Sequence, residues 1–574
     1  MAIILKKGRI TSAPSIPLNT SYERPSDWTD LPALSQGDEK IYMLVNVGEP
    51  DGSNYMRIKI FGDYQVDWGD GTAVTTHTSG TDADHEFLWA NAPSSTLTSQ
   101  GFRQVIVTIT PQSGAQLTQI RLSTSPYVPS DSEYNSSINH GVCRVKMAGP
   151  NFTSLHQAFY SYKGLKEFEF IGTNNITTFS AMFQVSSISK VTTLDTSSGT
   201  NFNNMFANSN IQEIPAFDLS SATDISYMFS VCVNITVLPT MALPSTCTNM
   251  QYTFNSCSLL QEIPFTSFDG VTNFFGAFQS TSIREFNYST PAITTAQQMF
   301  YSCRLLQTAI LKDIPVGQLL NTSYIVGYCD SLTYIEPFDT SNVTNFSRMF
   351  LGLKCNMDLS WVNTSSATTL THMFQGYATL KDASWLNVTS SVTIVTAIFS
   401  GCVSLVKFPT SMDLTNCTLL DSSFESCQSM LRVPTLNNSG NIVNIMKAFK
   451  NCYNLEVAPT FTGNQFTNIR ESFQACRNLS TIPQYDISLI TAYPNAYYAF
   501  NQCNNLRKSL ITTSKSEINY ANCCLSRAEI VNIFNNLQTS ADGRTIFIAS
   551  NPGSEDLTAS DLLIATNKGW TVSS

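Results

Sequence analysis

The chain of 574 residues is poor in charge, with Asp, Glu, Lys and Arg making up 13% of it, against about 25% in an average soluble domain. Its 32 basic residues form no dense block and are outnumbered by 42 acidic residues, which gives a formal net charge of −10. Nucleic-acid binding depends on clustered Lys and Arg that neutralise phosphates. We therefore expect no nucleic-acid partner, and we expect Ser, Thr, Asn and Gln to provide most of the contact with solvent.

Long apolar runs are also missing. No window approaches the roughly 18 consecutive apolar residues of a membrane-spanning helix, so we expect no membrane insertion. At the N-terminus the apolar residues 2–5 precede Lys6, Lys7 and Arg9, which reverses the order of a secretory signal. From the sequence alone, the expected location is the cytoplasm in which the chain is made, or a particle assembled there.

Residues that carry catalysis or bind metals are few and scattered. The five histidines share no motif, so no nucleophile–base pair can be assigned from them. CxxC pairs with zinc spacing are absent, and the adjacent Cys523 and Cys524 are a weak metal signal. We therefore expect no catalytic residue, no metal site, no cofactor and no enzymatic activity. The histidines are His77, His85, His140, His156 and His372.

What the chain has instead is a repeat. From Ser154 onward, a Phe that follows Met, Ala or another small residue recurs every 22 to 27 residues, and we call these positions anchors. Cys often follows three positions later, Leu or Ile six later and Pro ten later. Such a period predicts a solenoid of about fifteen coils, each burying its apolar face against its neighbours. The anchors are Phe159, Phe183, Phe206, Phe229, Phe254, Phe278, Phe300, Val326, Phe350, Phe374, Phe399, Phe424, Phe449, Phe473 and Phe500.

Each coil has the same internal order. The segment between Cys and Pro is short and rich in Leu, Ile and Val, which predicts one strand of a parallel sheet, and Pro ends the strand because it has no N–H to donate. Carboxylates recur after this segment. Asp at such a position accepts hydrogen bonds from backbone N–H groups, which favours a turn. A role in glycoside hydrolysis is less favoured, because these carboxylates fall mostly in non-adjacent coils. They are Asp218, Asp269, Asp339, Asp413 and Asp486.

Nine cysteines occupy one column, three residues after an anchor. Stacked coils keep their Cβ atoms near the 4.8 Å strand spacing, which exceeds the usual 3.5–4.5 Å of a disulfide. We therefore expect small buried thiols rather than a disulfide ladder. The column contains Cys232, Cys257, Cys303, Cys329, Cys402, Cys427, Cys452, Cys476 and Cys503.

The repeated pattern AF-x-x-C-x-x-L-x-x-I-P, as in AFKNCYNLEVAP at Phe449 and SFQACRNLSTIP at Phe473, resembles the BspA-type (Treponema pallidum-type) leucine-rich repeats. These occur in bacterial surface proteins and in some phage virion proteins. The resemblance covers residues 141–510 and implies a leucine-rich-repeat solenoid. This chain departs from the family at Val326, where the Phe is missing, and at Asn356, where the leucine column is interrupted.

The region before the repeats has a different sequence pattern. Residues 38–128 contain alternating runs such as MRIKIFG and FRQVIVTITP, which predict a small antiparallel β-sandwich. The segment VDWGDGT at residues 66–72 resembles the hairpin signature of PKD-type, immunoglobulin-like domains, and a hairpin is preferred over a calcium site at Asp67 and Asp70. Proline-containing residues 1–37 predict an extended arm, and residues 129–140 predict a connector.

After the last anchor, residues 511–574 predict an α/β cap that shields the final coil. The segment LSRAEIVNIFNNL at residues 525–537 has helical spacing, with Ser526 as the N-cap. A short strand, TIFIAS, and a second helical segment, DLLIATNKGW, follow. The region resembles the C-terminal cap of related phage and bacterial repeat proteins.

Trp361 and Trp385 form the candidate binding site. Both lie eleven residues after their anchors, so they are expected to stack on one face of successive coils and to offer a platform for a sugar ring. The alternative is that they fill the core column that Phe217 occupies in another coil.

These features together predict a mainly β, non-enzymatic structural and adhesive protein. The PKD-like and BspA-like modules resemble tailed-phage virion proteins such as fibres, head appendages or decoration proteins. This resemblance implies other virion proteins as partners of the arm, a host receptor or glycan as partner of the solenoid, and homo-oligomerisation, although no heptad run is present. The alternatives are a bacterial cell-surface BspA-like adhesin and, third, a glycan-depolymerising tailspike.

Overall fold

The computed structural model describes residues 22–49, 54–122, 141–463, 466–490, 494–511, 515–540 and 543–574. The chain divides into two compact units. The N-terminal unit extends to residue 241, except for residues 200–204 and 219–231, which belong with residues 242–574 to the C-terminal unit.

Two β-sheets form the first part of the N-terminal unit. One has the strand order β10-β9-β8-β1-β6-β3-β4 and the other has the order β5-β2-β7. Side chains along β2 are alternately buried and partly exposed, because successive residues of a strand point to opposite faces. The strands are β1 (Lys40–Val47), β2 (Tyr55–Phe61), β3 (Tyr64–Asp67), β4 (Thr75–His77), β5 (Asp82–Glu86), β6 (Arg103–Pro111), β7 (Gln119–Leu122), β8 (Val142–Ala148), β9 (Glu167–Ile171) and β10 (Lys190–Val191).

The predicted hairpin is confirmed, since β3 and β4 pair in antiparallel register on either side of Asp70 and Gly71. The backbone N–H of Thr72 donates to Asp70 Oδ1 at 3.1 Å, which fixes the turn. The immunoglobulin-like, PKD-type identity of this region stays a prediction.

The larger sheet changes direction at β8. Strand β8 is antiparallel to β1 but parallel to β9, which is in turn parallel to β10. The first coils of the repeat therefore extend the sheet of the preceding region, which the sequence did not predict.

Residues 22–37, the described part of the predicted arm, lie against this sheet. Trp28 and Leu31 are buried in a cluster with Leu44 and Cys143, and the backbone N–H of Thr29 donates to Gln104 Oε1 at 2.7 Å. Residues 1–21 lie outside the described part of the chain, so a docking role for the arm stays a prediction.

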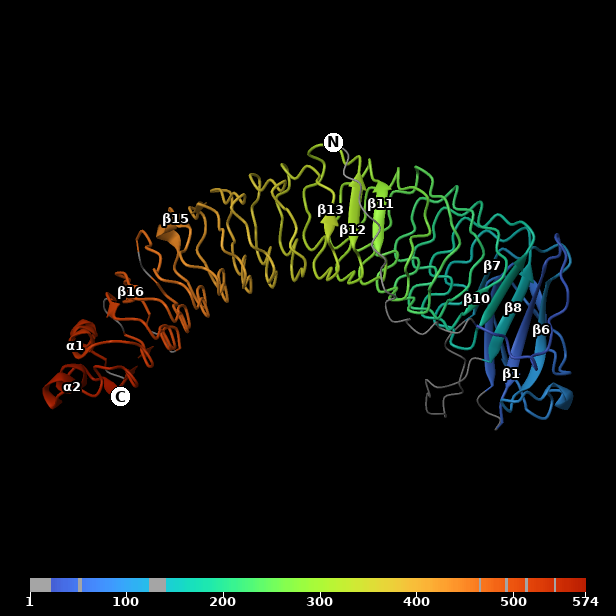
Figure 1. Ribbon diagram of the computed structural model, residues 1–574. Coiled ribbons are helices and arrows are strands. Elements are labelled where there is room, and N and C mark those ends of the chain that lie inside the picture. The colour runs from blue at the N-terminus through green and yellow to red at the C-terminus, as the bar shows by residue number, and fades with distance from the viewer. Residues whose placement is uncertain are drawn as a thin grey trace, which may run out of the picture. The chain divides into compact units, whose positions relative to one another are not determined.

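The coils contain parallel pairings, as predicted, but their strands are short. In the C-terminal unit β11, β12 and β13 lie side by side (Figure 1), and isolated parallel bridges such as Asp382 with Lys407 join many other coils. The elements are β11 (Glu285–Ser289), β12 (Thr308–Lys312), β13 (Tyr334–Ile335), β14 (Ser411–Asp413), β15 (Thr435–Asn437), β16 (Thr481–Ile482), β17 (Lys508–Ser509) and the 3-10 turn η2 (Ser439–Asn441). A second 3-10 turn, η1 (Ser94–Thr96), lies before the coils in the N-terminal unit.

The anchors form a column of buried rings within each unit, which confirms the solenoid. In the N-terminal unit Phe183 stacks on Phe159 and on Phe206, both at 5.4 Å between ring centroids. In the C-terminal unit every successive pair of anchors from Phe350 to Phe500 stacks at 5.1–5.9 Å. Val326 takes its place in the column with 0% exposure, so the missing ring leaves the coil in register.

A ladder of turns, rather than a strand, holds each anchor. Ser422, Phe424 and Ser426 donate their backbone N–H groups to carbonyls of the next coil at 2.7–2.9 Å. The residues between them donate to the carbonyl three positions earlier in their own coil. This alternation requires left-handed backbone at Ser422 and Ser426, with φ of 52° and 60°. The same two positions, two before and two after the anchor, are left-handed in coil after coil.

The predicted C-terminal cap is present. Helix α1 (Arg527–Asn536) begins after Ser526, whose hydroxyl accepts the backbone N–H of Glu529 as expected of an N-cap. Helix α2 (Ala559–Thr566) and the strands β18 (Ile518–Asn519), β19 (Thr545–Phe547) and β20 (Thr571–Ser573) complete it. None of the described helices has the length and hydropathy needed to cross a lipid bilayer.

Candidate functional site

Aromatic side chains gather on the turns of consecutive coils in the C-terminal unit, and we call them the aromatic stripe. Each lies within three residues of its anchor, and none is buried, in contrast to the anchors themselves. Tyr328 has the largest exposed fraction, at 38%. The stripe contains Tyr227, Tyr252, Phe275, Tyr301, Tyr324 and Tyr328.

The rings of the stripe form two sets of three, and within each set they contact one another across neighbouring coils. The ring of Tyr252 lies 5.2 Å from that of Tyr227 and 5.0 Å from that of Phe275. The ring of Tyr301 lies 5.2 Å from that of Tyr324 and 5.8 Å from that of Tyr328. Tilted and edge-to-face pairs at these distances contribute about 0.5–1.5 kcal/mol each beyond the area that they bury. The stripe is therefore fixed before any ligand arrives.

Three of these rings pack directly on glycines of the following coils. A Cβ at Gly276 would lie 2.2 Å from Cε1 of Tyr252, and a Cβ at Gly352 would lie 2.5 Å from the ring of Tyr328. A Cβ at Gly327 would lie 3.2 Å from the ring of Tyr301. The tyrosine rings thus lie directly on backbone.

Charged residues are rare in the stripe. The turn segments 249–256, 273–280, 295–302 and 321–328 contain no Asp, Glu, Lys, Arg or His, and the segment 224–231 around Tyr227 contains one, Asp224, whose carboxylate accepts the backbone N–H of Ser226. Burial raises the pKa of Tyr252 and of Tyr301, so both phenols keep their protons at neutral pH. The Arg348 guanidinium lies 5.1 Å from the ring of Tyr324 at one end of the stripe. The polar groups between the rings are therefore amides and hydroxyls.

Amide side chains bond to two of the tyrosine hydroxyls and to each other. The Tyr252 hydroxyl donates to Gln298 Oε1 at 3.1 Å, and Gln251 Nε2 donates to the Tyr227 hydroxyl at 3.2 Å. Asn321 Nδ2 donates to Gln297 Oε1 at 3.3 Å. Each amide retains further donors or acceptors for a ligand.

The two tryptophans singled out by the sequence pack mainly against phenylalanines. The ring of Trp361 lies 5.0 Å from that of Phe338, and the ring of Trp385 lies 6.0 Å from the anchor Phe374. Both remain partly exposed, and Trp385 borders a surface hollow of about 310 Å³. A sugar platform at Trp361 and Trp385 stays a prediction.

Two carboxylates, Asp358 and Asp382, also border this hollow. Hydrogen bonds from the Ser384 hydroxyl and backbone, together with Lys407, lower the pKa of Asp382 to about 2. Hydrogen bonds from Ser360 lower the pKa of Asp358 as well. Both carboxylates are therefore ionised at neutral pH, whereas glycoside hydrolysis requires one protonated acid.

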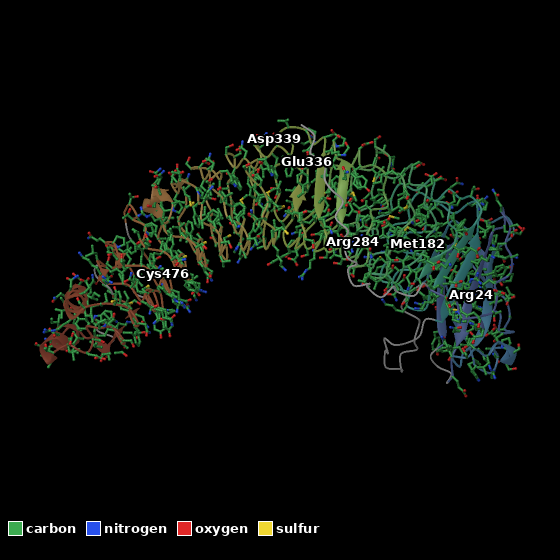
Figure 2. The ribbon with its side chains drawn as sticks, in the orientation of Figure 1. Arg24, Met182, Arg284, Glu336, Asp339 and Cys476 are labelled. Carbon is green, nitrogen blue, oxygen red and sulfur yellow. The ribbon has the colours of Figure 1, made fainter. Side chains whose placement is uncertain are left out.

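The turn role predicted for the repeated carboxylates is confirmed in three coils. Asp339, which Figure 2 labels, accepts the backbone N–H of Ser341 at 3.0 Å. Asp413 accepts from Thr415, and Asp486 accepts from Ser488, each two residues further on. These bonds match the turn preference of Asp.

The column cysteines are buried free thiols, as predicted. The structure adds that each of the nine thiols donates to the carbonyl of the preceding coil's anchor, at 2.9–3.2 Å. Cys476, labelled in Figure 2, donates to Phe449 at 3.0 Å. Burial raises the pKa of Cys303 to about 11, so these thiols are poor nucleophiles.

The histidines do not come together in a site. His85 Nε2 lies 2.8 Å from Asp70 Oδ2, and its ring stacks on Trp68 at 4.5 Å between centroids. His77, His156 and His372 lie on other elements, and His140 is outside the described residues. Within the described ranges, no group of three His, Cys, Asp or Glu residues is placed to hold a metal ion.

Sequence reasoning missed the aromatic stripe because its residues follow no single period. They lie three before, two before, one after or two after their anchors. The signal that could have found them is the charge-free, aromatic-rich composition of consecutive turns, such as NMQYTFNS, TAQQMFYS and NTSYIVGY.

Comparison with known proteins finds a family model and solved leucine-rich repeat proteins to which this chain is similar. A family described as "Mycoplasma protein of unknown function, DUF285" matches residues 153–268 and 321–438, and no curated protein matches significantly. A leucine-rich repeat protein from Bacteroides ovatus is 14% identical, covers 70% of this chain and 91% of its own, and has a TM-score of 0.31. A leucine rich cell surface protein from Faecalibacterium prausnitzii is 17% identical with the same coverage and a TM-score of 0.25. Because identities and scores are low, the solenoid assignment depends on the coils themselves.

Proposed function

We propose that this chain is a non-enzymatic binding protein of a bacterial cell surface, with the aromatic stripe as its contact surface. The observation that carries the proposal is the preformed row of partly exposed rings, each set by ring contacts or by a glycine seat. A rigid surface loses little conformational entropy on binding. Aromatic residues that are exposed together are also enriched at the centres of interfaces.

The thiols are compatible with an exposed location. All cysteines are free, and all except Cys355 and Cys524 are buried. Burial together with a raised pKa protects a thiol from oxidation. The fold therefore needs neither disulfides nor a reducing compartment.

Location is tested by protease treatment of intact producing cells. We expect the chain to be removed while a cytoplasmic marker survives. Recovery of the chain only from purified phage particles would instead support the virion role that the sequence analysis predicted, and would contradict a surface location.

Binding is tested with labelled chain on intact target cells and on extracellular material. Tyr301→Ala/Tyr324→Ala removes two rings of the stripe that contact each other, and we expect most of the binding to be lost. The control is Tyr453→Ala, because Tyr453 is a partly exposed tyrosine far from the stripe in sequence, with Arg477 stacked on it at 4.5 Å. Equal binding by both variants would contradict the assignment of the stripe.

A further inference from the structure

We propose that the ligand of the aromatic stripe is an uncharged polysaccharide chain. This inference deepens the proposed function and rests on it, since it names the chemical class that the stripe recognises.

The chemistry of the stripe selects against charged ligands. Apart from Asp224 near Tyr227, its turn segments have no charged residue, and Arg348 at one end already lies on the ring of Tyr324. Asp330, two residues after Tyr328, pairs with Lys354 of the next coil at 3.2 Å. Binding of a sulfated or carboxylated polymer would desolvate its charged groups. The stripe has no row of opposite charges whose attraction would compensate that free-energy cost.

The same chemistry matches a neutral sugar. A pyranose ring has faces of C–H groups that pack on an aromatic ring, and an edge of hydroxyls that both donate and accept hydrogen bonds. The stripe offers rings with amides between them, namely Gln251, Gln297, Gln298 and Asn321. An apolar helix, by comparison, requires a continuous hydrophobic groove, and here the amides interrupt the apolar surface.

The repeat favours a polymer over a single sugar. Tyr227, Tyr252, Phe275, Tyr301 and Tyr324 come from consecutive coils, and coils in a parallel ladder are spaced by about 4.8 Å. A linear glycan presents one sugar after another at a regular interval, so several rings can be engaged by one molecule. Linked contacts raise the overall affinity far above that of one contact.

Beyond Tyr328 the left-handed turn position is occupied by glycines. Gly352, which the ring of Tyr328 covers, is followed at the same position of the next two coils by Gly376 and Gly401, and a Cβ at Gly401 would lie 3.3 Å from the Cα of Gly376. Gly376 and Gly401 therefore present no side chain at this position, and a bound chain can extend over them.

The experiment measures affinity for immobilised mannan, β-glucan and galactan, with heparin and polygalacturonate as charged probes. The full chain should bind at least one neutral polymer and neither charged one. Tyr301→Ala should weaken that binding about tenfold, equivalent to roughly 1.4 kcal/mol. Tyr301→Phe, which keeps the ring, should retain most of the affinity, and Tyr453→Ala should not change it. Thermal unfolding of each variant verifies that it is folded.

The outcomes separate this inference from the proposed function. If Tyr301→Ala/Tyr324→Ala abolishes binding to cells while no neutral polymer binds, the stripe is a contact surface but its ligand is not a neutral glycan. The inference is also overturned if heparin or polygalacturonate binds more tightly than the neutral polymers. The same holds if a neutral polymer binds and the tyrosine variants leave its affinity unchanged. If the variants change neither cell binding nor polymer binding, both proposals fail.

Discussion

At the scale of single residues, two features recur along the solenoid: buried protonated thiols in nine coils and left-handed turn residues around every anchor. Both are consequences of the coil ladder rather than of local sequence preference. The nine column thiols donate to anchor carbonyls, most of which also accept a backbone N–H of their own coil, as Phe399 accepts both the Cys402 N–H and the Cys427 thiol. Left-handed backbone occurs even at the β-branched Val185 and Val231. Each feature leads to a prediction about stability.

The buried thiols predict a loss of stability at alkaline pH. Burial raises the pKa of Cys303 and Cys417 to about 11 and that of Cys232 to about 12, whereas an unfolded thiol has a pKa of about 8.5. Above about pH 9 the unfolded chain therefore binds fewer protons than the folded chain, and the free energy of unfolding falls as pH rises. We expect it to be constant from pH 7 to 8 and to decrease from pH 9 to 11, by up to about 1.4 kcal/mol per pH unit for each such thiol.

Urea unfolding across this pH range measures the effect. Cys427→Ala/Cys452→Ala removes two buried thiols, so the free energy of unfolding should fall less steeply between pH 9 and 11. At pH 7 the variant should be less stable than the unmodified chain, because it loses packing and the hydrogen bonds of the two thiols. A slope that is unchanged in this variant, or stability that rises with pH, would contradict the account.

The left-handed turns predict a stabilising substitution. Val231 has φ of 61° and is 39% exposed, and a β-branched residue is unfavourable in this conformation. Asn451 occupies the equivalent position of a later coil with the same φ of 61°. Val231→Asn should therefore raise the free energy of unfolding by about 0.5–1 kcal/mol, since Asn tolerates left-handed backbone. The control is Val233→Asn, at a position that is 45% exposed but not left-handed; a similar gain there would indicate a mere effect of surface polarity.

At the scale of the element, the unit of this fold is the turn around each anchor, together with any aromatic ring of that turn that packs on the backbone of the next coil. Gly352 and Gly376 illustrate the difference between the two roles. Both are left-handed, with φ of 68° and 71°, but only Gly352 lies under a tyrosine ring. A Cβ at Gly376 would meet the Cα of Gly352 at 3.6 Å, which is an ordinary contact.

We therefore expect Gly352→Ala to destabilise the chain more than Gly376→Ala does. Each substitution has the cost of a non-glycine residue in left-handed backbone, about 1 kcal/mol. Gly352→Ala adds a clash with Tyr328, and moving that ring costs about a further 1–3 kcal/mol. Chemical unfolding of the two variants gives the difference directly. Equal losses would show that Gly352 does not seat the ring of Tyr328.

The sequence was sufficient to predict those elements whose pattern is enforced by burial. The anchor Phe, the column Cys and the capped helix after Ser526 each require one residue type at a fixed spacing, so the period is visible in the sequence. The left-handed positions contain Tyr, Arg, His, Lys, Glu and Ser as well as Gly, because hydrogen bonds to the next coil impose that conformation. The aromatic stripe was missed for the same reason: its side chains are exposed, so no packing constraint makes them periodic.

At the scale of the whole molecule, the coils are nearly interchangeable, because their backbone hydrogen bonds and anchor stacking join each coil to its neighbours. The backbone N–H groups of Phe374, Phe399 and Phe424 donate to Ile398, Ser423 and Ala448 of the next coil at 2.9 Å in each case. Their rings stack at 5.7 Å and 5.8 Å between centroids. Stability in such an array is approximately a sum of coil terms and neighbour terms.

This interchangeability predicts that one whole coil can be removed. Deleting residues 400–424 joins Phe399 to Glu425, the residue that now follows Phe424. Phe399 then takes the place of Phe424, so its N–H can donate to Ala448 and its ring can stack on Phe449. We expect a folded protein with one cooperative transition at a slightly lower midpoint, followed by circular dichroism. Deleting residues 400–412 is the matched control, because it leaves a partial coil whose core residues fall on the turns, and we expect it to unfold part of the C-terminal unit. If both deletions were equally disruptive, the coils would depend on contacts beyond their neighbours, and the fold would not be the one-dimensional ladder that its hydrogen bonds describe.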